Sequence, residues 1–136
     1  MKRFYLDTNV VIDYLLKREP FFLMAKQLFA AADNRQIQLL VSSLTFTTAH
    51  YLARQPLGKD QALQVLTDLF QQVTVVAVGS SEIEKALQSG LPDFEDAAQL
   101  FAALAAGADA IVTRDPKGFP TQQVPVLNPL AALAQL

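Results

Sequence analysis

The chain has 136 residues, of which 51% are hydrophobic and 18% are charged, and its formal net charge is −2. This length suffices for one hydrophobic core and is short for two, so we expect a single domain over residues 1–136. The apolar content argues against disorder, and the absence of cysteine excludes disulfides, thiolate metal sites and a thiol nucleophile.

Charged or amide side chains interrupt every apolar run before it reaches the roughly 18 residues that a membrane span requires. Asp7 comes too early for the apolar region of a signal peptide, so we expect a cytoplasmic protein without a membrane span. A nucleic-acid substrate would need a local basic rim and metal ions, since the net charge is negative. The basic candidates, most of them interpreted singly as solvated surface charge, are Lys17, Arg18, Arg54, Lys59, Arg114 and Lys117; only Arg114 and Lys117 are expected beside the site described below.

Apolar periodicity and turn-forming residues divide the chain into alternating strands and helices. The expected strands are residues 3–6, 36–43, 73–78, 110–113 and 124–127. The expected helices are residues 9–16, 20–32 with Pro20 in the first turn, one capped by Ser43 or Thr45 and running to about Arg54, 62–72, 80–87, 93–107 and 128–136. Such alternation with apolar strands predicts an α/β fold, a three-layer α/β/α sandwich around a mainly parallel sheet of about five strands.

Ligand sites in open α/β sheets lie beyond the carboxyl ends of the strands, and polar residues follow two of the expected strands. Asp7 ends the first strand and is followed by Thr8 and Asn9. Asp7 alone could equally cap the next helix, but either neighbour could do that without a charge, which favours a site. After the fourth strand, Thr113 and Asp115 place a hydroxyl and a carboxylate, although Asp before proline is also a common turn starter.

A third acidic group opens the expected helix 93–107, where Asp93 is a good N-cap and Asp96 occupies the reciprocal position of a capping box. Capping alone explains such acids in most helices, and Glu95 points either toward the strand ends or toward solvent. The whole set changes this interpretation, because carboxylates distant in sequence converge on one sheet edge. Their repulsion calls for cations, and oxygen ligands without cysteine select Mg²⁺ or Mn²⁺, which suit phosphate chemistry.

Several segments together resemble PIN-domain proteins, in order and across nearly the whole chain: LDTNVVIDYLLKREPFF, SSLTFTTAHYL, LPDFEDAAQLFAA, GADAIVTRDPKGF and PVLNP. The first and fourth of these segments contain the most specific matches. The resemblance implies metal-dependent cleavage of RNA by metal-activated water, as in VapC-like toxins, which a small antitoxin protein holds inactive. By motif, Asp7, Asp96 and Asp115 resemble the metal ligands, with Glu95 assisting and Thr8, Asn9 and Thr113 as supporting groups.

The chain departs from the family pattern in the helix after the second strand, where many members have a Glu and this sequence places Thr48. The subgroup without this Glu is the one that the chain resembles most. Three consequences are open: weaker metal binding, compensation by Glu95, or loss of activity.

The alternative function is therefore a catalytically inactive PIN-like module that binds RNA or a protein partner, although such a module would gain nothing from clustered acids facing phosphate. His50 has no evident orienting partner, so packing or surface is the simpler interpretation. A homodimer through the apolar helices at residues 20–32 and 60–71 is plausible from their pattern, which serves a core equally well.

Overall fold

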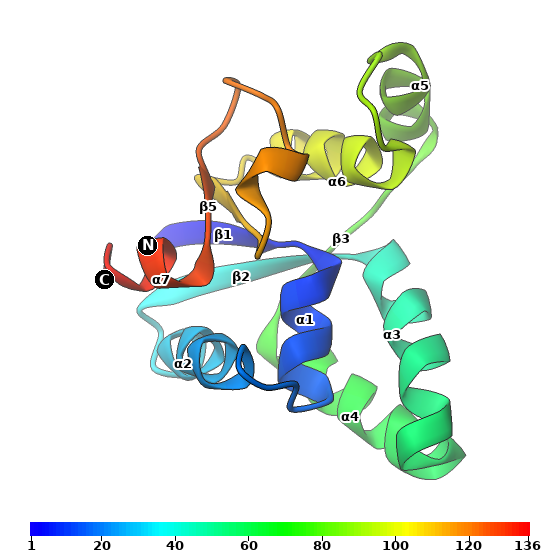
Figure 1. Ribbon diagram of the computed structural model, residues 1–136, viewed down its shortest axis with the longest axis vertical. Helices are drawn as coiled ribbons and strands as arrows, with labels where there is room; N and C mark the ends of the chain where they lie inside the picture. Colours follow the sequence, from blue (N-terminus) through cyan, green and yellow to red (C-terminus); the bar gives the residue numbers. More distant parts are fainter.

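A five-stranded parallel sheet lies between two layers of helices in the computed structural model, which describes all 136 residues (Figure 1). The strands in chain order are β1 (Lys2–Leu6), β2 (Ile37–Ser42), β3 (Thr74–Val76), β4 (Ala110–Val112) and β5 (Val126–Leu127). Their order in the sheet is β3-β2-β1-β4-β5, and every neighbouring pair is parallel. The predicted three-layer α/β fold is confirmed.

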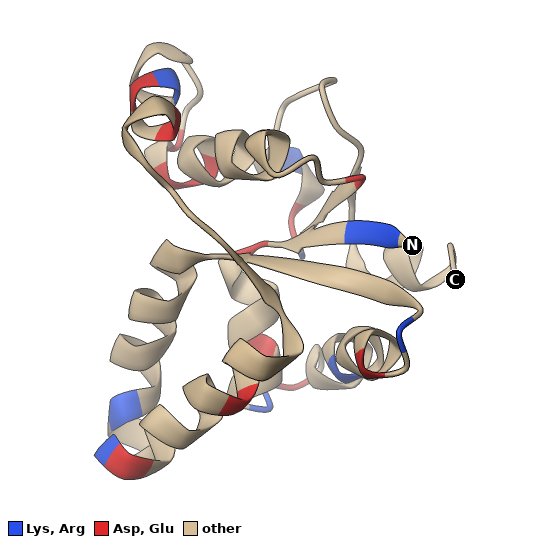
Figure 2. Ribbon diagram, turned by 180° about the vertical axis from the view of Figure 1, so that it is seen from behind, with Lys and Arg blue, Asp and Glu red and all other residues tan.

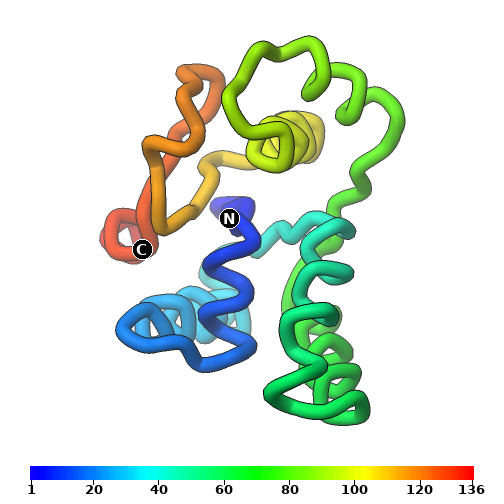
Figure 3. Tube along the Cα trace, turned by 45° about the vertical axis from the view of Figure 1, so that its right-hand side comes forward, coloured from blue at the N-terminus to red at the C-terminus, as the bar shows by residue number.

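Seven helices and one 3₁₀ turn connect the strands: α1 (Thr8–Leu15), α2 (Phe22–Asp33), α3 (Ser43–Leu57), α4 (Lys59–Gln72), α5 (Ser80–Gln88), α6 (Phe94–Ala105), η1 (Pro116–Gly118) and α7 (Pro129–Leu133). Helices α5 and α6 lie over one side of the sheet, while α1, α2 and α4 lie over the other (Figure 1). Helices α3 and α4 run side by side as a pair that projects away from the sheet (Figure 3). None of the helices combines the length and hydropathy that crossing a membrane would require.

The strands are apolar on both faces because each face packs against a helical layer. In β1, Phe4 and Leu6 belong to the core that includes residues of α1, α2 and α7, whereas Tyr5 belongs to the core that includes α6. The same alternation divides β2 and β4 between the two cores. Side chains alternate along a strand, so one short central strand contributes to both cores at once.

The path of the chain creates a crevice next to β1. From β1 the chain moves outward to β2 and β3, and then returns to β4 on the opposite side of β1. Leu6 is in register with Val112, and the Asp7 N–H donates to the Val112 carbonyl at 2.9 Å. Parallel pairing thus places the residues that follow β1 beside those that follow β4, at the position where open α/β sheets bind ligands.

Several predicted boundaries were wrong. Helix α4 begins at Lys59 instead of residue 62, β5 begins at Val126 instead of residue 124, and α7 ends at Leu133 instead of residue 136. Three further differences have a clear structural cause. Helix α3 continues to Leu57 with Pro56 inside its last turn, beyond the expected end near Arg54, and it stops where Gly58 adopts a φ of 81°. Its cap is Ser42, whose hydroxyl accepts from the Leu44 N–H at 3.0 Å, instead of Ser43 or Thr45. Strand β3 stops at Val76 because its register partner Ser42 is the last residue of β2 before the chain turns into α3.

A mutation in α2 tests the larger core. Phe29 is 1% exposed and its ring stacks on Tyr14 with 3.8 Å between centroids, whereas Leu23 on the same helix is 60% exposed. We expect Phe29→Ala to lower the free energy of unfolding by about 3–5 kcal/mol, since it removes a buried ring and leaves a cavity. Leu23→Ala is the control and should stay within about 0.5 kcal/mol of wild type. Urea denaturation of both variants measures the difference; equal stabilities would contradict this packing.

Candidate active site

Asp7 is the centre of the polar cluster beyond the strands. Its Oδ1 accepts from the Thr8 N–H at 2.7 Å, so Asp7 does cap α1. The same oxygen also accepts from the Gln99 side-chain amide at 2.6 Å, and Oδ2 accepts from the Thr113 hydroxyl at 2.7 Å. An Asp that only capped α1 would need no hydrogen bond from Gln99 on α6 or from Thr113 after β4. Asp7 is also only 6% exposed. Capping and membership of a buried cluster therefore coincide in one residue.

Thr113 and Asn9 connect the ends of β1 and β4. Besides donating to Asp7, the Thr113 hydroxyl accepts from the Asp115 N–H at 3.2 Å and from the Asn9 amide at 3.5 Å. The side-chain Oδ1 of Asn9 in turn accepts from the Arg114 backbone N–H at 3.4 Å. Thr113 is fully buried, so its hydroxyl depends on these partners. The two side chains hold the loop after β4 against the start of α1.

Helix α6 brings two more carboxylates to Asp7. One oxygen of each of Asp7, Glu95 and Asp96 lies within 4.8 Å of the others. Asp93 caps the helix, accepting from the Asp96 N–H at 2.9 Å, while no hydrogen bond returns from the Asp96 carboxylate to the cap. Capping thus explains Asp93 but leaves the Asp96 carboxylate free to join the cluster, and Glu95 points toward the strand ends.

Gln99 holds two of these acids together, and sequence reasoning missed it. Its amide nitrogen donates to Asp7 Oδ1 and to Glu95 Oε1, one turn earlier on α6. Its amide oxygen accepts from the Tyr5 hydroxyl at 3.2 Å, and burial raises the pKa of that hydroxyl, which keeps it a donor. Tyr5 therefore fixes the orientation of the amide, so that two N–H groups face two carboxylates. The sequence feature that could have indicated this role is a glutamine in an otherwise apolar stretch of the expected helix.

Asp115 lies on the other side of Asp96, in the loop where η1 begins. A β-carbon added at Gly118 would lie 3.4 Å from Asp96 Oδ2 and 3.5 Å from Asp115 Oδ2, so the two carboxylates flank this glycine. Asp115 also starts the turn that its position before proline suggested, since its carbonyl accepts from the Gly118 N–H at 3.0 Å. The structure thus brings Asp115 near Asp96 but outside the tight group of three acids.

A hollow opens over the cluster. It is lined by Asp7, Thr8, Asn9, Ile12, Arg18, Thr48, Leu52, Glu95 and Asp96. Thr48, at the position where the family resemblance implies a Glu, lines this hollow, and Glu95 supplies a carboxylate to it. Red segments, marking acids, appear both at the end of β1 and at the start of α6 (Figure 2). Arg18, predicted as surface charge away from the site, lines the hollow instead, because the chain turns back after α1.

Burial and the close approach of these acids raise the pKa values of Glu95 and Asp96. Burial and the neighbouring Asp7 and Asp96 charges raise the pKa of Glu95 to about 7, although the Gln99 hydrogen bond opposes the shift. Burial and the charges of Asp7, Asp93 and Asp115 raise the pKa of Asp96 to about 6. A bound cation would remove this repulsion. The donors are all oxygens, which fits Mg²⁺ or Mn²⁺, and Asp7, Glu95 and Asp96 are the residues placed to hold such an ion.

A buried ion cluster below the hollow was also missed from the sequence. Asp13 on α1 is 1% exposed. Arg18 Nε donates to its Oδ1 at 3.1 Å, and Arg114 Nε lies 2.7 Å from its Oδ2 in an ion pair whose angle is poor for a hydrogen bond. Burial raises the pKa of Asp13 and the two arginines oppose that shift. In the sequence, residues 9–16 show only the apolar spacing of a helix, and nothing in that pattern indicates that Asp13 is buried.

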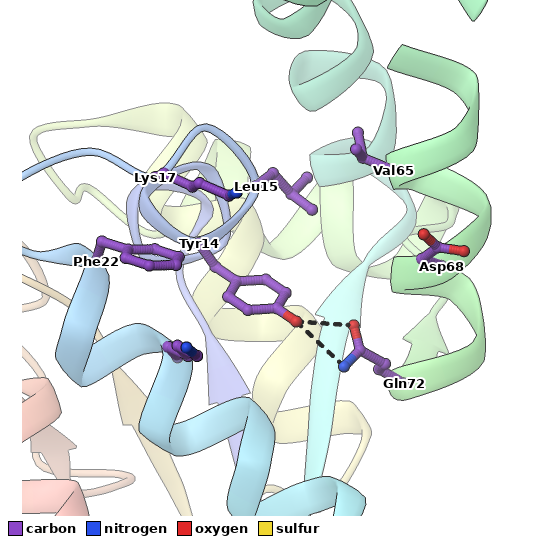
Figure 4. A pocket seen from close by; sticks show the side chains of 8 residues that line it. Tyr14, Leu15, Lys17, Phe22, Val65, Asp68 and Gln72 are labelled. Carbon is purple, nitrogen blue, oxygen red and sulfur yellow. Dashed lines mark hydrogen bonds between the residues drawn. The ribbon is translucent and has the colours of Figure 1, made fainter. Parts of the chain in front are cut away.

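A second hollow lies between α1, α2 and α4, away from the acids. Figure 4 shows Tyr14, Phe22 and Val65 around it, with the Tyr14 hydroxyl and the Gln72 amide hydrogen-bonded to each other at 3.3 Å. Its lining contains one carboxylate, Asp68, beside Lys17 and Lys26, and therefore no group of acids that could hold a metal ion. The acidic hollow is therefore the candidate site.

One known protein family matches most of the chain. The sequence profile of the PIN domain matches residues 3–117, which is most of the chain. This chain belongs to the PIN-domain family. The resemblance seen in the sequence motifs is thereby confirmed, and Asp7, Glu95, Asp96 and Asp115 all lie within the matched region of this PIN domain.

Individual relatives are more distant. Ribonuclease VapC1 of Aquifex aeolicus is 25% identical over 132 residues, covering 93% of this chain and 90% of the relative. Among solved structures, DNA-bound VapBC from Salmonella typhimurium matches with a TM-score of 0.70 and 20% identity, covering 95% of this chain and 99% of that one. The sarcin-ricin loop cleaving toxin VapC20 of Mycobacterium tuberculosis matches at 0.64 and 17%, covering 79% and 86%. At these identities the structures establish a shared fold.

Replacing the amide that holds the acids tests the cluster. We expect Gln99→Leu to weaken Mn²⁺ binding by about 10- to 100-fold, because Asp7 and Glu95 lose the donor that orients them. Titration calorimetry measures the affinity, and Gln27→Leu on the exposed side of α2 is the matched control. Unchanged affinity in Gln99→Leu would show that the amide does not organise the ligands.

The raised pKa values also predict how stability depends on pH. Glu95 and Asp96 bind protons more tightly in the folded chain than in the unfolded chain, where their pKa values are near 4.5 and 3.8. Without metal, their contribution to stability is therefore lost as pH rises through about 4 to about 7. The melting temperature in EDTA should fall by a few degrees across this range, a modest change because solvent screens both groups. Glu95→Gln should flatten the curve; a wild-type curve that rises would contradict the arrangement.

Proposed function

We propose that this PIN domain is an endoribonuclease that requires Mg²⁺ or Mn²⁺ and acts in the cytoplasm as the toxin of a toxin–antitoxin pair. The observation that carries the proposal is the group of three carboxylates, Asp7, Glu95 and Asp96, with Asp115 beside them at the switch point of the sheet. The ribonuclease name of the Aquifex relative and the VapBC titles of similar structures support the substrate and the toxin role.

The roles that we propose follow from the hydrogen bonds. Asp7, Asp96 and Asp115 would be metal ligands, and Glu95 would supply the carboxylate that Thr48 lacks. A bound divalent ion would polarise a phosphoryl oxygen and lower the pKa of a nearby water. Thr113 and Gln99 fix the orientation of Asp7, while Asn9 anchors the loop that bears Asp115. The chain's own contribution is a set of acids held close together before any substrate arrives.

Two partners complete the proposal. The VapBC complexes among similar structures support an antitoxin protein that would hold this domain inactive. A homodimer remains our proposal for the free protein. Leu28 and Phe29 of α2 are in the core, whereas Leu23 on the same helix is 60% exposed. On α4, Leu63 and Phe70 are 48% and 62% exposed, so both helices could contribute side chains to a shared interface.

Cleavage of a mixed-sequence RNA tests the activity. We expect wild type to cut with Mn²⁺ or Mg²⁺ and not in EDTA, and Asp7→Asn to reduce the rate by more than about a hundredfold, since this change acts directly on a ligand. Asp68→Asn, an exposed acid on α4, should leave the rate unchanged. Gel electrophoresis of the products gives the rates.

Thr48 favours one other function, an inactive module that binds RNA or protein. If wild type shows no cleavage with any divalent ion and calorimetry shows no metal binding, the enzyme proposal fails and the binding module is the better account. Cleavage that persists equally in Asp7→Asn would point instead to a contaminating nuclease.

A further inference from the structure

One basic side chain lines the acidic hollow. Among the residues that line it, Arg18 is the only basic one, and it lies in the turn between α1 and α2. Its guanidinium forms no ion pair with Asp7, Glu95 or Asp96, because its only carboxylate partner within 4.0 Å is Asp13. Arg18 therefore does not simply neutralise the cluster. It offers positive charge at the edge of a site that otherwise repels polyanions.

The position of Arg18 is fixed from below. Its Nε donates to Asp13 Oδ1 at 3.1 Å, and its backbone N–H donates to the Asp13 carbonyl at 3.0 Å. The Phe21 N–H donates to the Arg18 carbonyl at 3.0 Å, which closes the turn. This Nε bond is the only side-chain hydrogen bond that Arg18 makes, and the side chain is 42% exposed. Its two terminal NH₂ groups are thus free, on a guanidinium that is already oriented.

Asp13 has a second basic partner besides Arg18, so the charge of Arg18 is not required to neutralise it. Arg114 Nε lies 2.7 Å from the other oxygen of Asp13, and its guanidinium stacks on the Phe21 ring at 4.0 Å. With all three groups ionised, two guanidinium groups share one carboxylate, so the cluster keeps one positive charge. Arg114 is packed against an aromatic ring, whereas Arg18 faces the hollow. The excess charge is therefore available where Arg18 lies.

We propose that Arg18 binds a backbone phosphate of the RNA strand, next to the phosphodiester that the acidic cluster cuts. A planar guanidinium with free NH₂ groups pairs with phosphate oxygens in a bidentate manner. This inference rests on the proposed ribonuclease function and adds a substrate contact to it. Asp13 is the positioning residue for this contact, since it acts on the phosphate only through Arg18, which it holds in place.

The test is binding of a fluorescent single-stranded RNA at several salt concentrations, with Ca²⁺ replacing the catalytic ion. Arg18→Gln keeps a donor toward Asp13 but loses the charge, and we expect about tenfold weaker binding. The slope of log K against log salt should become shallower by about 0.7, the value for one lost phosphate contact on a single strand. Arg18→Lys keeps the charge and should retain most of the slope.

The control is Arg35→Asn, which removes one positive charge at the opposite end of the strands, at a residue whose φ of 59° asparagine tolerates. It should change neither affinity nor slope. If Arg18→Gln lowers only the melting temperature and leaves RNA affinity and slope as in wild type, Arg18 merely supports Asp13 and the inference is wrong. If wild type neither binds nor cuts RNA, the proposed function itself has failed, whereas cutting with an unaffected Arg18→Gln overturns this contact alone.

Discussion

The structure depends on the carboxylate of Asp7, which is buried beside the carboxylates of Glu95 and Asp96. Asp7 follows the central strand and receives hydrogen bonds from its own helix, from α6 and from the end of β4. Burying a charge is costly unless such donors replace water, so these contacts must all form together. The parallel register of β1 with β4 and the packing of α6 on the sheet are what bring the donors within reach.

The acids are held close by amide and hydroxyl groups instead of by basic residues. Gln99 and Thr113 bring no charge to the cluster, so its negative field stays intact and is available to a divalent cation. The two nearest arginines, Arg18 and Arg114, form their ion pairs with Asp13 and not with these acids. Two adjacent clusters of opposite sign therefore coexist, one suited to a metal and the other to a phosphate, which are the two components of a phosphodiester-cleaving site.

Much of this could be predicted from the sequence, for physical reasons that differ between residues. Strands such as residues 3–6 are recognisable because period and apolarity are local, and the acids Asp7 and Asp115 because they follow such strands. Gln99, Asp13 and Arg18 were missed or misplaced because their roles depend on partners up to 101 residues away in the chain, as for Asp13 and Arg114. Boundaries failed where sheet register decided them, as at Val76, since local propensity contains no information about a neighbouring strand.

The order of the strands has a consequence for synthesis on the ribosome. Asp7 is made well before its partners Gln99 and Thr113, which are 92 and 106 positions later in the chain. Strand β1 therefore lacks its β4 neighbour until residues 110–112 have been made, and loop closure over such distances is slow. A nascent or truncated chain that ends before residue 110 lacks β4 and cannot enclose Asp7. The chain thus acquires a complete site only after β4 and the loop with Asp115 have been synthesised.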